Sequence, residues 1–236
     1  MRYFDSIISV LIVAAAFICY YYINRLKSIR DYLTKKLGEE QGQIRLVIFQ
    51  RLCGVLFFGI IPAFFFLFLM NSSIVSFVLR IHFDLYSFIA IISLGFIAFL
   101  INYFNAKSPE NLKMYPQIRT KNWTLSLLAL SGLSWMAYLF AYEYLFRGFL
   151  LFSCAGELGV LIAIIVNVFI YAFVHLYKGT KETIGAIPMG IILCILTLHF
   201  GTIWAAFWIH SCLALSNEWF SILHNPKIKI RKYNFK

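Results

Sequence analysis

Long apolar segments separated by short polar and basic ones dominate the pattern of this chain. A helix rises about 1.5 Å per residue, so each segment can cross a hydrocarbon layer of about 30 Å. The pattern predicts seven membrane-spanning helices, at 4–23, 52–70, 85–104, 123–156, 158–177, 183–200 and 201–224. The fourth segment is longer than one crossing needs, which predicts a long tilted helix or a break near Ser131 and Gly132 that would create an eighth span.

The polar segments between the spans are predicted to lie at the membrane surface. Residues 24–44 are predicted to form a surface helix, and residues 74–84 an outer connector or a half-buried helix. Pro62 is expected to kink the second span because its ring removes a backbone N–H. The basic stretch after the first span predicts a retained anchor with its N-terminus outside, since a cleaved signal carries its basic residues before the apolar run.

Composition supports an all-α polytopic membrane protein, a helical bundle of about seven or eight transmembrane helices. The chain has 236 residues, of which 61% are hydrophobic and 13% charged, and its mean hydropathy is +0.80. These values are typical of a membrane domain. Without an internal repeat, the chain is predicted to be one membrane domain with three parts: N-terminal spans and loops at 1–122, a core at 123–224 and a basic tail at 225–236.

The formal net charge of +11 has a membrane explanation rather than a nucleic-acid one. Each basic cluster adjoins an apolar segment, and seven spans put all of the clusters on one side. The positive-inside rule then makes that side cytoplasmic, including the C-terminus, and no nucleic acid is expected as a partner. The clusters lie at 25–36, 107–121, 178–181 and 227–236.

The five cysteines lie within apolar segments and form no C-x-x-C pair, so we expect buried free thiols. They are Cys19, Cys53, Cys154, Cys194 and Cys212.

Glu143 and Arg147 lie four residues apart in the otherwise apolar stretch AYEYLFRGFLLF at 141–152. This spacing puts both side chains on one helix face. An ionisable residue inside a membrane is costly to keep, and its default interpretation is functional. The pair alone fits two hypotheses equally well: a functional carboxylate, or a structural ion pair that holds two helices together.

Two later apolar segments also carry polar side chains. Asn167, Tyr171 and His175 recur every four residues and give one polar stripe on a helix. The last segment carries His210, with Asn217 two turns further on. Depths counted from the nearest turns at about 1.5 Å per residue allow these histidines to share a pocket with the carboxylate of the fourth span.

Glu143, His175 and His210 would limit such a pocket to a few reactions. A carboxylate beside a neutral imidazole can activate water, and a second imidazole can donate a hydrogen bond to a developing oxyanion. This set predicts hydrolysis of a peptide bond within the membrane. The same three side chains could instead bind zinc, although the sequence contains no H-E-x-x-H motif.

Three segments of the chain resemble, in order and spacing, the signature segments of the CPBP family. They are Y-E-Y-L-F-R-G-F-L at 142–150, Y-A-F-V-H-L at 171–176 and G-T-I-W-A-A-F-W-I-H at 201–210. The family, also called Abi, groups CAAX prenyl proteases with bacteriocin-processing or immunity proteins. Its pattern is E-E-x-x-x-R, then F-x-x-x-H, then H-x-x-x-N or H-x-x-x-D. The resemblance covers about residues 123–220.

The resemblance implies a polytopic intramembrane endopeptidase, described as metal-dependent in older usage and as glutamic-type more recently. In the family, the first Glu and the His of the second segment activate water, while the His and Asn of the third segment stabilise the oxyanion. The matching positions here are Glu143 for the second motif carboxylate, Arg147 for the arginine, and His175 and His210 for the histidines.

Three positions depart from the family pattern. Tyr142 replaces the first Glu, Ala214 replaces the last Asn, and Tyr171 replaces the Phe that heads the second segment. A tyrosine hydroxyl, with an ordinary pKa of about 10, is a poor general base near neutral pH. Asn167 and Asn217 are candidate replacement hydrogen-bond donors.

The leading hypothesis is a CPBP-type endopeptidase in a bacterial cytoplasmic membrane, in contact with membrane lipid. It would cleave a membrane-proximal or C-terminal peptide segment with Glu143, His175 and His210. The alternative is a catalytically impaired family member that acts as a peptide-binding, bacteriocin-immunity or scaffold protein. A transporter is disfavoured because the chain shows no paired broken helices from a repeat. No cofactor is assigned from the sequence, and zinc is the one candidate.

Overall fold

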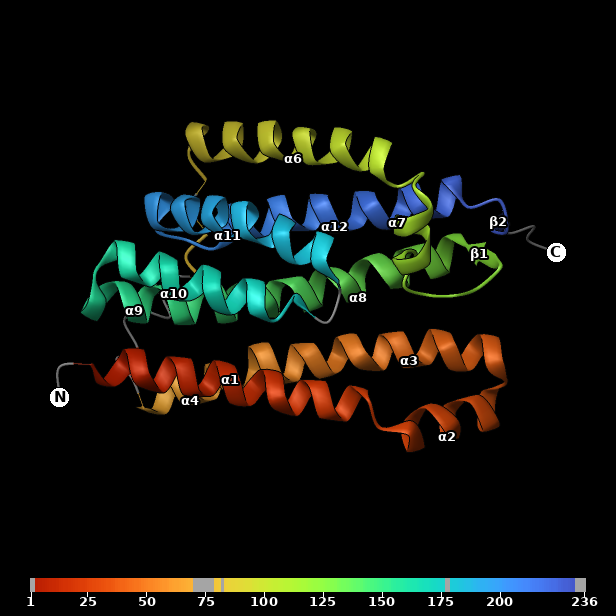
Figure 1. The fold of residues 1–236 in the computed structure, drawn as a ribbon, viewed down its shortest axis with the longest axis horizontal. Coiled ribbons are helices and arrows are strands. Elements are labelled where there is room, and N and C mark those ends of the chain that lie inside the picture. The colour runs from red at the N-terminus through yellow and green to blue at the C-terminus, as the bar shows by residue number, and fades with distance from the viewer. Residues whose placement is uncertain (1–2, 70–78, 82, 177–178, 232–236) are drawn as a thin grey trace.

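The computed structural model of the chain is a bundle of helices that run roughly parallel to its long axis (Figure 1). It describes residues 3–69, 79–81, 83–176 and 179–231. The first part of the bundle consists of α1 (Phe4–Asn24), α2 (Lys27–Leu37), α3 (Glu39–Gly54), the π-helix η1 (Val55–Ile60), α4 (Ile61–Leu69) and α6 (Leu85–Asn105). The predicted connector at 74–84 falls largely outside the described residues.

The second part begins with the short helix α7 and the short strand β1, which pairs in parallel with β2 near the C-terminus. A long helical run, a hairpin and a final helix follow β1. The elements are α7 (Pro109–Met114), β1 (Asn122–Thr124), α8 (Leu125–Glu143), η2 (Tyr144–Leu150), α9 (Leu151–Leu158), α10 (Val160–Phe173), α11 (Thr180–Phe200), α12 (Trp204–His224) and β2 (Lys229–Arg231).

The helices confirm an all-α polytopic membrane protein. Within the described residues, five helical runs are long and apolar enough to cross a membrane: Phe4–Asn24, Glu39–Phe68, Leu85–Asn105, Leu125–Leu158 and Thr180–Phe200. They correspond to five of the seven predicted spans.

The other two predicted spans differ from these five. The segment predicted at 158–177 contains a helix of only 14 residues, α10. The segment predicted at 201–224 forms the 21-residue helix α12, whose apolar sequence is interrupted by His210, Asn217 and Glu218.

The fourth run is continuous and does not break near Ser131 and Gly132. α8 passes through both positions, and the run changes instead to a π-helix directly after Glu143. A second π-helix, η1, stands just before Pro62, where the kink was expected. Proline removes one backbone donor from a helix, and a wider turn is one way to accommodate that loss.

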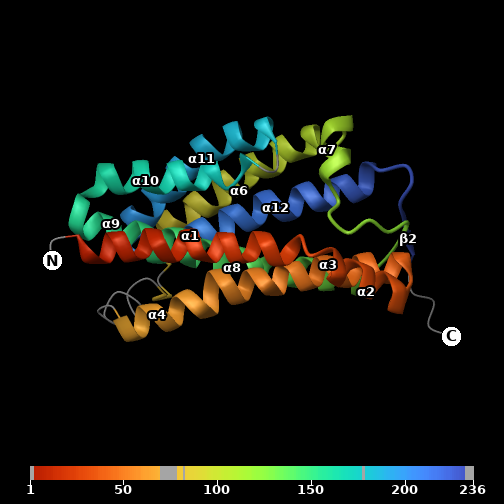
Figure 2. The same cartoon turned by 60° about the horizontal axis from the view of Figure 1, so that its bottom comes forward.

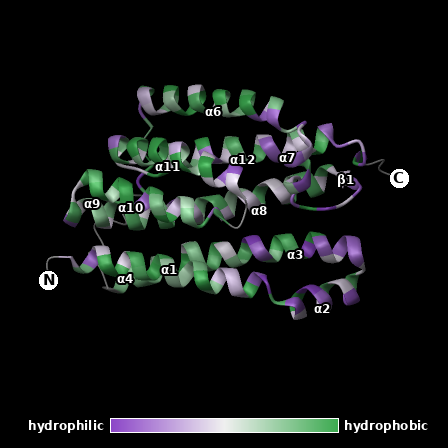
Figure 3. Ribbon diagram, in the orientation of Figure 1, coloured by the Kyte–Doolittle hydropathy of each residue, from purple (hydrophilic) through white to green (hydrophobic). Residues whose placement is uncertain are grey.

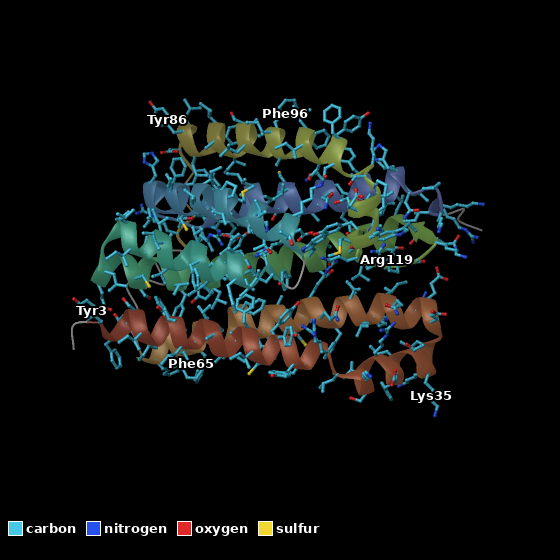
Figure 4. The ribbon with its side chains drawn as sticks, in the orientation of Figure 1. Tyr3, Lys35, Phe65, Tyr86, Phe96 and Arg119 are labelled. Carbon is cyan, nitrogen blue, oxygen red and sulfur yellow. The ribbon has the colours of Figure 1, made fainter. Side chains whose placement is uncertain are left out.

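The ends of the bundle differ in polarity (Figure 3). Hydrophilic residues gather at the end that contains α2, α7, β1 and the C-terminal segment, whereas the opposite part of the bundle is mostly hydrophobic. Apolar side chains also cover the outer side of α6, where Tyr86 is 73% and Phe96 58% exposed (Figure 4). In a membrane protein, such a surface contacts the hydrocarbon of the bilayer.

Polar side chains connect helices that are far apart in the sequence. The Asn102 amide of α6 donates to the Leu213 carbonyl at 2.6 Å and to Ser216 Oγ at 2.8 Å, both on α12. At the other end of the bundle, Glu157 accepts hydrogen bonds from the backbone N–H groups of Asp5 and Ser6. A carboxylate at this position satisfies donors of the first turn of α1 and complements the helix dipole.

The expected burial of all five thiols is only partly right. All five cysteines are free, and Cys53, Cys154 and Cys194 are buried. Cys19 and Cys212 are exposed, because α1 and α12 each turn part of their surface out of the bundle.

Two glycines allow helices to approach closely. A Cβ atom at Gly42 of α3 would lie 2.9 Å from the Thr34 Cα atom of α2. A Cβ atom at Gly54 would overlap the ring of Tyr138 on α8. That ring cannot move easily, because it packs against the rings of Tyr20, Phe58 and Tyr142.

We therefore predict that Gly54→Ala lowers the free energy of unfolding by about 1–3 kcal/mol, the usual cost of overpacking. The matched control is Gly156→Ala in α9, where an added Cβ meets nothing within 4 Å. Alanine there is expected to stabilise the helix by up to about 1 kcal/mol. Thermal unfolding of both variants in the same detergent measures the difference, at about 2–4 °C per kcal/mol. Equal melting temperatures would contradict the prediction.

Candidate active site

Glu143 lies at the end of α8, and both of its carboxylate oxygens face charged or polar partners. Oε1 is 2.6 Å from His210 Nδ1 of α12. Oε2 is 3.3 Å from Arg147 Nε, one turn along the same helical run. Both Glu143 and Arg147 are 0% exposed. An ionised carboxylate can only accept hydrogen bonds, so Nδ1 of His210 carries the proton.

Arg147 lies in the π-helix η2, and its guanidinium packs against an aromatic ring. The arginine guanidinium lies 4.3 Å from the centre of the Tyr171 ring of α10, close enough for a cation–π contact. Asn167 Nδ2, also on α10, donates to the Phe146 carbonyl of η2 at 2.7 Å. Because π-helical turns leave carbonyls poorly paired, this amide stabilises the segment that positions the arginine.

His175 follows the end of α10 and faces the same region of the bundle. Its Nδ1 lies 2.7 Å from the Tyr171 carbonyl. A carbonyl can only accept, so Nδ1 donates and the neutral ring presents Nε2 as an acceptor. The ring also stacks on Tyr171, with centroids 4.6 Å apart.

Tyr142 lies between the two histidines. Its ring centroid is 6.4 Å from that of His175 and 6.0 Å from that of His210, in edge-to-face arrangements. Phe146 and Tyr138 pack on the same ring, at 4.8 Å and 5.9 Å. An aromatic ring therefore occupies the position where the family pattern has a carboxylate.

A cavity of about 1240 Å³ lies between these side chains and the polar end of the bundle. Tyr142, Tyr171, His175 and His210 line it, whereas Glu143 does not. The carboxylate therefore lies behind His210 and contacts the cavity only through that imidazole.

α10 and α11 border the cavity where they adjoin. α10 ends at Phe173 and α11 begins at Thr180, and the two helices lie side by side (Figure 2). The cavity is also lined by the C-terminal half of α1, the end of α6 and the middle of α12.

The supporting residues predicted from the sequence separate into two groups. Asn167 is buried and bonded to Phe146 and Cys194, so it supports the fold around Arg147 and is not among the cavity-lining residues. Asn217 lines the cavity, and its buried Oδ1 has no hydrogen-bond partner. Of the two predicted donors, Asn217 is therefore the one that can reach a ligand in the cavity.

Sequence reasoning missed a second buried ion pair, Arg51 of α3 with Glu218 of α12, at 3.8 Å. Arg51 also donates to the Ser131 carbonyl at 2.7 Å and to Gln117 Oε1 at 3.0 Å. The guanidinium lines the cavity and lies 4.7 Å from the Trp135 ring centre. The signal was present in the sequence, because Arg51 immediately precedes the apolar run that begins at residue 52.

The side chains proposed as zinc ligands do not fit a metal site. Among the described residues, no group of three or more His, Cys, Asp or Glu side chains could hold a metal ion. Glu143 is held by His210 and Arg147 and does not line the cavity, so its carboxylate is not placed to complete a ligand set with His175 there.

The fold and the cavity define the class of this protein: a polytopic helical membrane protein with two imidazoles facing a large internal cavity, one of them bonded to a buried carboxylate. The family model for type II CAAX prenyl endopeptidase Rce1-like proteins matches residues 122–216. The match agrees with the CPBP-family resemblance over these residues, which are less than half of the chain. Comparisons with curated proteins and with solved structures give no match.

The burial of the Glu143–Arg147 pair predicts a large effect of removing one partner. Arg147→Met leaves the carboxylate uncompensated, and we expect a loss of about 3–5 kcal/mol in stability. Replacing both residues, as Glu143→Leu with Arg147→Met, should recover much of this loss, because apolar side chains replace a desolvated pair.

Thermal unfolding of the single and double variants measures the coupling, with Arg30→Met on the exposed surface of α2 as the control. If the double variant were as unstable as the sum of the two singles, the pair would not be coupled.

Proposed function

We propose that the protein is an intramembrane endopeptidase that binds a membrane-proximal or C-terminal peptide segment in the cavity and hydrolyses it. The observation that carries the proposal is that His175 and His210 both line this one cavity. Glu143 lies outside the cavity and orients the His210 imidazole by accepting its Nδ1–H. The family match supports the same class of reaction.

His175 acts as the general base in this proposal. The Tyr171 carbonyl holds the Nδ1 proton, so Nε2 can take a proton from water. The water oxygen then attacks the peptide carbonyl carbon. When the tetrahedral intermediate collapses, the C–N bond breaks and the departing nitrogen takes the proton back from His175.

His210 and Glu143 stabilise the oxyanion of that intermediate. In this step the imidazolium form of His210 keeps Nδ1–H on the Glu143 carboxylate and donates Nε2–H to the negatively charged oxygen. Glu143 is a positioning residue, because it acts through the imidazole and does not itself reach the cavity. Asn217 is the candidate for an additional donor, in place of the asparagine that Ala214 replaces.

A second candidate function is peptide binding without hydrolysis, as in an immunity or scaffold protein. The observation that favours it is the Tyr142 ring, which lies beside both imidazoles where the family pattern has its water-activating carboxylate. The cavity and its aromatic lining would still bind a peptide in such a protein.

The proposed setting is a bacterial cytoplasmic membrane, with the C-terminus in the cytoplasm. The hydrophilic end of the bundle carries β2, with Lys229 and Arg231, and the positive-inside rule would make that end cytoplasmic. Polar side chains such as Arg51, Glu110 and Gln117 line the cavity, and in this proposal the peptide enters from the cytoplasmic side.

The test uses the full chain in lipid nanodiscs with a library of membrane-anchored peptides, both prenylated and unprenylated, and identifies products by mass spectrometry. Wild type should release a defined product. Glu143→Gln keeps the size of the side chain but removes its charge, and it should lower kcat about 100-fold with little change in KM. Glu143→Asp should restore part of the loss. His224→Gln is the control, because His224 lies on the same helix but not among the cavity-lining residues.

If wild type binds peptides but releases no product, hydrolysis is excluded and the second candidate holds. In that case Tyr142→Glu combined with Ala214→Asn, which restores the family pattern, should introduce cleavage into the same cavity. A general loss of peptide binding in Glu143→Gln would instead assign this residue a structural role only.

A further inference from the structure

A second cleft lies between α2 and α3, outside the candidate active site. It has a volume of about 500 Å³ and shares no lining residue with the larger cavity. Gly42 makes it possible, since it lets the backbone of α2 pack directly on α3. We call it the α2–α3 cleft; its lining residues are Ser28, Ile29, Tyr32, Leu33, Arg45 and Phe49.

Two cations lie at this cleft. Arg45 is exposed and forms part of the lining. Lys36 Nζ donates to the Tyr32 hydroxyl at 3.1 Å, which brings a second positive charge to the same lining residue. None of the six lining side chains is acidic. An anionic group is therefore the complementary ligand.

An apolar stripe leads away from the cations along α3 and η1. Arg45, Phe49, Leu52 and Leu56 follow one another at i, i+4, i+7 and i+11, which places them on one helix face. Leu52 is 56% and Leu56 42% exposed, so the stripe is open to the surroundings. From the first residue to the last it extends about 16 Å, close to half of a hydrocarbon core of about 30 Å.

The position of the cleft suits a membrane surface. α2 lies between two candidate membrane spans, Phe4–Asn24 and Glu39–Phe68, and none of its residues is buried. It is at the hydrophilic end of the bundle, where Lys35 marks the outer end of the helix (Figure 4). Basic residues next to a transmembrane helix attract anionic lipid headgroups.

We propose that the α2–α3 cleft binds one anionic phospholipid. The phosphate group contacts Arg45 and Lys36, and one acyl chain follows Phe49, Leu52 and Leu56 toward the centre of the bilayer. Glu40 of α3 accepts a hydrogen bond from Thr120, in the loop between α7 and β1, and no lining residue of the cleft is acidic.

The experiment titrates detergent-solubilised full chain with dioleoyl-phosphatidylglycerol or dioleoyl-phosphatidylcholine and counts bound lipids by native mass spectrometry. The two lipids share their acyl chains, so the difference reports the headgroup. We expect the anionic lipid to bind at least about tenfold more tightly at the first site. Arg45→Gln should weaken the anionic lipid about fivefold and leave phosphatidylcholine unchanged.

The matched control is Arg30→Gln, which removes one exposed positive charge from α2 outside the cleft lining. It should change binding of the anionic lipid by less than about twofold. Equal affinity for the two lipids, or equal losses in Arg45→Gln and Arg30→Gln, would overturn the proposal, the latter because it indicates diffuse attraction to a charged surface. Weaker binding of inorganic phosphate than of the lipid is also expected, and the reverse would assign the site to a free anion.

Discussion

The interaction on which the site depends is the buried contact of Glu143 with Arg147 and His210. A carboxylate and a guanidinium without exposed surface are stable there only because each compensates the other. The third partner is His210 of α12, whose Nδ1 lies 2.6 Å from Glu143 Oε1 at the end of α8. One carboxylate thus fixes the relative position of two helices, the orientation of one imidazole and the placement of the arginine. The proposed stabilisation of the oxyanion by His210 would depend on this contact.

The same contact explains why the carboxylate does not face the cavity. Glu143 Oε1 contacts His210 and Oε2 faces Arg147, and the carboxylate is not among the groups that line the cavity with His175. The ring of Tyr142 takes the intervening space and packs against both imidazoles. In the proposed hydrolysis, water activation would therefore fall to an imidazole rather than to a carboxylate, a weaker arrangement than two groups acting together.

The sequence predicted the class of fold and the meeting of Glu143 with Arg147, because hydropathy and the four-residue spacing each have a direct physical basis. Depth counting also allowed His210 to approach Glu143, which the structure confirms. Other features had no sequence signal. The π-helix after Glu143, the short α10 and the orientation of the Tyr142 ring all result from tertiary packing. Asn167 was predicted as a donor because it shares the stripe with His175. Its side-chain amide donates instead to the Phe146 carbonyl of η2.

The bundle contains two buried ion pairs near the cavity, and only one of them contributes a side chain to the cavity wall. Glu143–Arg147 lies behind the imidazoles, out of the cavity, and stabilises the joint between α8 and η2. Arg51–Glu218 joins α3 to α12, and its arginine forms part of the cavity wall near Gln117 and Trp135. Arg51 donates to Ser131 and Gln117, whereas Arg51 Nε and Glu218 Oε1 have no hydrogen-bond partner among the described residues. The desolvation of this pair is therefore only partly compensated, and removing either partner would leave a buried charge unpaired.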